Sequence, residues 1–232
     1  MNISIKSSQA QPIPGSSTLG KTGIDRSPER ESEAKSFAAG SRETVSISGS
    51  AKALYAQNTA VERQSLMSPS ELKGLYHKTE LDIVSFSHRI GSRSFDRDSL
   101  LPDTNDAARL EMGRKALDFA VSLHQSPPGR ATNPFASMNR KDLSGMVYDD
   151  SVSFTMAERY AASVELRKQD SDHFAMLTAK LKLGGDNQQV FKGILEYFDD
   201  LAPVEKAAYP DSFRESIEKL AARTETPIEF NQ

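Results

Sequence analysis

Apolar residues recur every three or four positions through most of the chain after residue 50. This spacing places apolar side chains along one face of a helix. No alternation typical of a strand persists beyond about four residues. We therefore expect an all-α fold, a helical bundle of about six to eight helices. The expected helices cover about 50–64, 69–90, 105–124, 139–147, 156–183, 187–201 and 210–221, and Asp170-Ser171-Asp172 either breaks the fifth or lies on its polar face.

Two segments carry the signature of a helix start. Ser68 is followed by Pro69 and, three residues on, by Glu71, which predicts a capping box with proline in the first turn. Thr155 and Glu158 have the same spacing and predict a second capping box. Asp186 is the expected cap of the helix that follows it.

The helix predicted over 105–124 has two further features. Asp103 or Thr104 is the expected N-cap, because both residue types accept hydrogen bonds from exposed backbone amides. Gly113 and Ala116 lie on or beside its apolar stripe and are small. We therefore expect a neighbouring helix to approach closely there.

Composition separates the chain into a tail and a domain. Residues 1–50 hold twelve serines and a single aromatic residue, Phe37. Such a stretch buries too little apolar surface to offset the entropy of ordering. We expect a disordered serine-rich tail over 1–48, a helical domain over 49–224 and a loose C-terminal tail over 225–232. The Pro- and Gly-containing segment 125–138 is a candidate junction between two subdomains.

Several classes of function are disfavoured by composition. The chain has no cysteine, which excludes disulfides, thiol nucleophiles and cysteine-ligated metals. Its 29 basic and 32 acidic residues give a net charge of −3, which argues against nucleic-acid binding. No apolar run reaches the roughly 18–20 residues that span a bilayer, and the N-terminus lacks the apolar core of a signal peptide. We expect a location in the bacterial cytoplasm, or secretion without a cleavable signal peptide.

The start of the chain resembles bacterial export signals. Residues 1–24 are serine-rich and contain no acidic residue, and in this they resemble the N-termini of type III secretion substrates. The stretch TVSISGSAKAL, residues 44–54, is similar to the V-x-I/L-S-x-x-A-x-x-L entry of anti-sigma factors linked to flagellar export. Both resemblances imply export by a type III-type route. A generic flexible N-terminus is the alternative reading.

Residues 147–158 resemble the calcium-binding loop of an EF-hand. In that register Asp149, Ser151 and Glu158 fall at the third, fifth and twelfth positions, where EF-hand loops supply oxygen ligands. Val147 at the first position has no side-chain oxygen, and Val152 replaces the glycine of the sixth. The resemblance implies a calcium site formed by these three residues. The alternative is a structural turn, in which Glu158 serves the Thr155 capping box.

No motif assigns an enzymatic activity. The chain lacks G-x-S-x-G, H-E-x-x-H and the glycine-rich phosphate-binding motifs. We expect no cofactor, calcium excepted, and a protein partner; the oligomeric state is open. The function we expect is that of a bacterial helical interaction protein. A calcium- or metal-responsive helical module and an enzyme with an unrecognised site are the alternatives.

Overall fold

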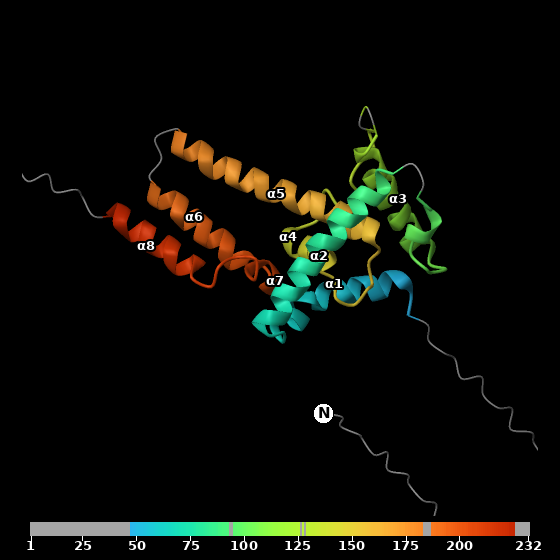
Figure 1. The fold of residues 1–232 in the computed structure, drawn as a ribbon, viewed down its shortest axis with the longest axis horizontal. Helices are drawn as coiled ribbons and strands as arrows, with labels where there is room; N and C mark the ends of the chain where they lie inside the picture. The colour runs from blue at the N-terminus through green and yellow to red at the C-terminus, as the bar shows by residue number, and fades with distance from the viewer. Residues whose placement is uncertain (1–46, 93–94, 126, 128, 183–186, 226–232) are drawn as a thin grey trace, which may run out of the picture. The chain divides into compact units, whose positions relative to one another are not determined.

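The computed structural model describes residues 47–92, 95–125, 127, 129–182 and 187–225, and among these it contains eight α-helices and no strand (Figure 1). The all-α prediction is confirmed. The helices are α1 (Gly49–Ser65), α2 (Pro69–Ile90), α3 (Ala107–Leu123), α4 (Arg140–Val147), α5 (Met156–Lys182), α6 (Asn187–Asp200), α7 (Pro203–Lys206) and α8 (Phe213–Glu225), with a 3-10 turn, η1, at Asp98–Leu100.

The predicted N-terminal tail falls almost wholly on residues 1–46, which lie outside the described residues. The predicted C-terminal tail and the Asp186 cap also lie outside them, except that Glu225 ends α8. At the start of the domain, the Ser48 hydroxyl accepts a hydrogen bond from Ala51 N and α1 begins at Gly49. Among the described residues, no helix is long and apolar enough to cross a membrane.

The core forms where α5 packs against α2, α3 and α4. Ala157 and Ala161 of α5 are completely buried, and small side chains let these helices approach closely. Leu143 and Met146 of α4 fill the space beside them. Phe135, in the segment 125–138, belongs to the same core; the subdomain junction there stays a prediction.

Away from this core, the end of α5 and helices α6 and α8 run side by side (Figure 1). Phe198, Tyr209 and Phe213 form an aromatic cluster with ring centroids 4.6–5.4 Å apart. Helix α5 continues without a break through Asp170-Ser171-Asp172, so those residues do not end it. Asp172 is exposed and pairs with Lys168 at 2.8 Å.

Helix α3 differs from the prediction in two ways. Its N-cap is Asp106 rather than Asp103 or Thr104, because the Asp106 carboxylate accepts hydrogen bonds from the first-turn amides. That carboxylate also accepts a hydrogen bond from Ser50 N of α1 at 2.9 Å, which is the main reason that its pKa falls to about 2. Gly113 approaches Pro102 of a loop, not a neighbouring helix: a Cβ there would lie 2.4 Å from Pro102 Cδ.

Candidate functional site

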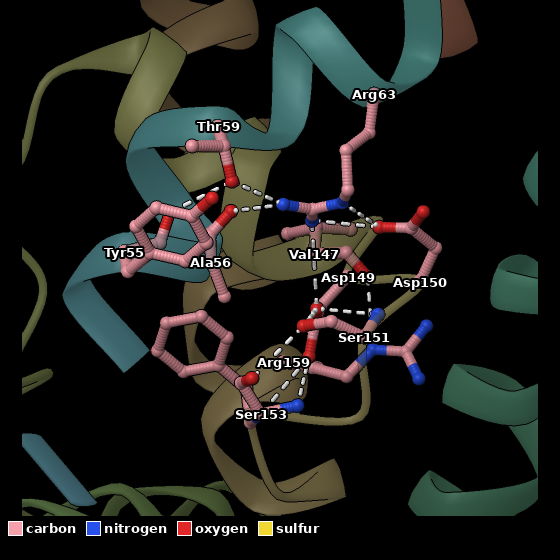
Figure 2. Close-up of polar contacts among 11 residues, drawn as sticks. Tyr55, Ala56, Thr59, Arg63, Val147, Asp149, Asp150, Ser151, Ser153 and Arg159 are labelled. Atoms are coloured by element: carbon pink, nitrogen blue, oxygen red, sulfur yellow. Dashed lines mark hydrogen bonds and ion pairs between the residues drawn. The ribbon is translucent and has the colours of Figure 1, made fainter. Parts of the chain in front are cut away.

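The loop between α4 and α5 is folded around the buried carboxylate of Asp149 (Figure 2). Asp149 Oδ1 accepts hydrogen bonds from Ser151 N at 2.9 Å and Ser151 Oγ at 2.5 Å. Asp149 Oδ2 accepts from Ser153 N at 2.6 Å and Phe154 N at 3.0 Å. One side chain therefore takes up three backbone N–H groups of its own loop, which fixes the path of the chain from 149 to 154.

Val152, at the tip of this loop, has a strained backbone. Its φ of 58° makes it the single non-glycine residue with positive φ in the described part of the chain. A β-branched residue in this left-handed region is a genuine outlier and costs about 1–2 kcal/mol. Val152 is 89% exposed, so burial of its side chain does not offset the energy of this strain. The hydrogen bonds to Asp149 on either side of Val152 hold the strained conformation in place.

Two arginines fasten the loop and its base to neighbouring helices. Arg63 of α1 donates from Nε to Asp150 Oδ1 at 2.8 Å and is held by Ala56 O and the Thr59 hydroxyl on its own helix (Figure 2). Arg159 of α5 donates from Nε to Val147 O at 2.9 Å. Its Nη2 donates to Thr79 Oγ1 of α2 at 3.0 Å, and burial lowers the pKa of this arginine. The loop is therefore tied to α1, and Arg159 links the end of α4 that precedes it to α2 and α5.

Glu158 is completely buried and pairs with the Arg109 guanidinium of α3, with Nη2 lying 2.6 Å from Oε2. The predicted capping box is confirmed, because Thr155 N donates to Glu158 Oε2 at 2.8 Å and Glu158 N donates to Thr155 Oγ1 at 3.3 Å. Arg109 also donates to Ser153 O at 2.8 Å, and burial lowers its pKa. This ion pair joins α3, α5 and the loop.

The structure brings together two of the three residues of the calcium prediction. Ser151 lies against Asp149, whereas the Glu158 carboxylate accepts hydrogen bonds from Arg109 and Thr155. Within the described ranges, no three His, Cys, Asp or Glu side chains gather in a way that could hold a metal ion. Each carboxylate thus has a structural role in the loop. Calcium binding stays a prediction, which calorimetry with calcium on the wild type and on Glu158→Gln tests.

A groove lies between the loop and one face of α2. It has a volume of about 600 Å³ and runs from Leu75 to Arg89, about 21 Å at 1.5 Å per residue. Leu75 and Phe86 of α2, Val152 of the loop and Met156 of α5 supply its apolar surface. The guanidinium of Arg89 lies over the Phe86 ring, 5.6 Å from its centroid. An exposed, rigidly held apolar side chain therefore stands at the rim of an elongated groove.

Sequence reasoning missed the arginines of this site. Arg109 precedes Gly113 by four residues and so shares its face of the helix, and a charge within an apolar stripe signals a buried ion pair. Nothing in the sequence indicated its partner, because 49 positions separate it from Glu158. No protein-family model, no curated protein and no solved structure matches this chain.

Proposed function

We propose that this protein is a helical binding protein that contacts a protein partner through Val152 and the adjoining groove. The observation that carries the proposal is the geometry of Val152, which combines positive φ with 89% exposure. Backbone strain persists only where the surroundings enforce it, and it concentrates at functional positions. A glycine would relieve the strain and remove an exposed apolar side chain, and a contact of Val152 with another molecule explains why this position is a valine.

The groove is lined by three basic residues and three acidic ones (Lys78, Arg89, Arg159, Asp82, Asp149 and Asp150), and the arginines that lack an ion pair indicate the chemistry of the partner. Arg89 and Arg159 both line it, and neither has a carboxylate within ion-pair distance in the part of the chain that the structure describes. Arg159 donates instead to two neutral oxygens. A partner segment that places an apolar side chain against Val152 and an acidic side chain near either arginine fits this surface.

Site-specific photo-crosslinking in the producing cells tests the proposal. A photoreactive residue is introduced at Val152 and, as a matched control, at Leu81, an exposed apolar position on α2 (68% exposed) that does not line the groove. We expect a discrete adduct from position 152 that position 81 does not give. The proposal fails if position 152 gives no adduct, or if both positions give the same ones.

Export by a type III-type route is a separate proposal that rests on the resemblances of residues 1–24 and 44–54 to export-linked sequences. It is tested by comparing secretion of the full-length chain with a chain that lacks residues 2–30. Equal secretion of both would overturn it and would leave the proposal for Val152 untouched.

A further inference from the structure

A second cavity, of about 350 Å³, lies between the opposite side of α2 and helices α4 to α7. Four tyrosines line it: Tyr76 of α2, Tyr148 directly after α4, Tyr197 of α6 and Tyr209 after α7. The Tyr76 and Tyr148 rings are stacked with their centroids 5.8 Å apart. Its volume is at the small end of the range for ligand pockets, so it suits one functional group with a short chain.

Charged side chains of both signs complete the wall. Arg140 lies between Asp170 and Glu205, with its Nη2 2.5 Å from Glu205 Oε1. Arg167 donates to Glu80 Oε2 at 2.9 Å. Three carboxylates facing two guanidinium groups leave one excess negative charge on the wall.

Burial and the neighbouring charges also shift the pKa values of the side chains that line the cavity. Burial raises the pKa of all four tyrosines and of Glu205, and nearby carboxylates add to the shift at each tyrosine. At Arg140, burial disfavours the charge, yet Glu205 and Asp170 outweigh it and raise the pKa. Burial therefore disfavours charge of either sign in this cavity, and the carboxylates offset that cost for a cation that lies beside them.

Tyr148 supplies a polar group. The residue as a whole is only 5% exposed, and it lines the cavity, where its hydroxyl can accept a hydrogen bond from a ligand. The cavity wall already contains one cation packed on an aromatic ring, because the Arg140 guanidinium lies over the Tyr197 ring, 4.9 Å from its centroid. Aromatic faces attract cations in this geometry.

We propose that this cavity binds an alkylammonium or alkylguanidinium group, held by the faces of the tyrosine rings and the carboxylates of Glu80 and Asp170. A donor on the ligand meets the lone pairs of the Tyr148 oxygen, and the excess negative charge of the wall is neutralised. The cation belongs either to a free small molecule or to a lysine or arginine side chain of a partner. This site is distinct from the groove beside Val152, and neither proposal depends on the other.

Titration of the full-length protein with butylguanidinium, followed by calorimetry and by NMR, tests the inference. Butylurea has the same shape without the charge and serves as the matched ligand. We expect butylguanidinium to bind and butylurea to bind at least 10-fold more weakly. Tyr148→Phe removes one hydroxyl and should weaken binding about 3- to 10-fold. Tyr55→Phe, at an exposed position on α1 outside the cavity, should leave the affinity unchanged.

A peptide that contains one internal arginine distinguishes the two possible sources of the cation, a free small molecule and a side chain of a partner protein. If butylguanidinium binds as tightly as the peptide, the ligand is a small molecule; if the peptide binds more tightly, the ligand is a side chain of a partner. The inference is overturned if neither binds at millimolar concentration, if butylurea binds as well as butylguanidinium, or if Tyr148→Phe and Tyr55→Phe have equal effects. Thermal unfolding of both variants shows that each is folded under the conditions of the titration.

Discussion

The buried ion pair between Arg109 and Glu158 gives the sharpest prediction about stability. The two side chains are 6% and 0% exposed, so neither is accessible to bulk water. Glu158→Gln keeps the size of the side chain and an oxygen for the capping box, but leaves the Arg109 charge buried without its counter-ion. Removal of one partner of a buried pair costs about 3–5 kcal/mol. Since small domains are stable by only about 5–15 kcal/mol, this is a large fraction of the total.

The double variant Arg109→Met, Glu158→Gln separates charge from packing. It removes the stranded cation, so we expect it to recover at least about 2 kcal/mol relative to Glu158→Gln alone. The remaining loss comes from the hydrogen bond of Arg109 to Ser153 O, at about 0.5–1.5 kcal/mol. Asp172→Asn is the control, because it breaks an exposed pair and should cost no more than about 0.5 kcal/mol.

The assay is urea unfolding of the four proteins, followed by far-UV circular dichroism, with calcium and with a chelator. If Glu158 acts through Arg109, the free energy of unfolding of the wild type is the same in both solutions. A cost below about 1 kcal/mol for Glu158→Gln, or a double variant no more stable than the single one, would refute the reasoning from burial.

Four further substitutions have predicted outcomes in the same unfolding assay. Val152→Gly should raise the free energy of unfolding by up to about 1 kcal/mol, because relief of strain exceeds the added freedom of the unfolded chain; a loss of stability would contradict it. Gly113→Ala should destabilise the fold by about 1–3 kcal/mol, because its Cβ clashes with the rigid Pro102 ring. Gly74→Ala should stabilise the fold by about 1 kcal/mol, because Gly74 lies in α2 with open space around it. If both substitutions changed stability in the same direction, the packing argument would be wrong. Burial raises the pKa of Glu205 above its ordinary value of 4.5. The stability that the protonated carboxyl of Glu205 contributes is therefore full below pH 4.5 and is lost as the pH rises through the raised pKa. Glu205→Gln should flatten this decline in the free energy of unfolding, and a pH profile equal to that of the wild type would contradict the prediction.

Local signals in the sequence predicted the helices well. The capping boxes at Ser68 and Thr155 follow from residue types three positions apart, and the structure contains both. The short helix α7 and the turn η1 were not predicted, because segments of three or four residues have no measurable apolar period. The cap of α3 was misplaced because Asp106 also bonds to Ser50 of α1, a contact between residues 56 positions apart.

The sequence indicated some residues of the candidate site but not the contacts that shape it. The resemblance to an EF-hand loop directed attention to Asp149 and Glu158, and both are buried there. The conformation of Val152 depends on hydrogen bonds within the loop, and the hold of Arg63 on Asp150 joins residues 87 positions apart. Such contacts arise from tertiary packing and leave no local pattern. The tyrosine-lined cavity is likewise assembled from five separate helices.

The affinity of Val152→Gly for the partner that crosslinks at position 152 tests the central claim most directly. If the strained valine is kept for binding, the dissociation constant of the variant rises about 10-fold or more, as expected for the loss of a buried valine side chain, although the fold is no less stable. An unchanged dissociation constant in a folded variant would contradict the claim that Val152 is a contact residue.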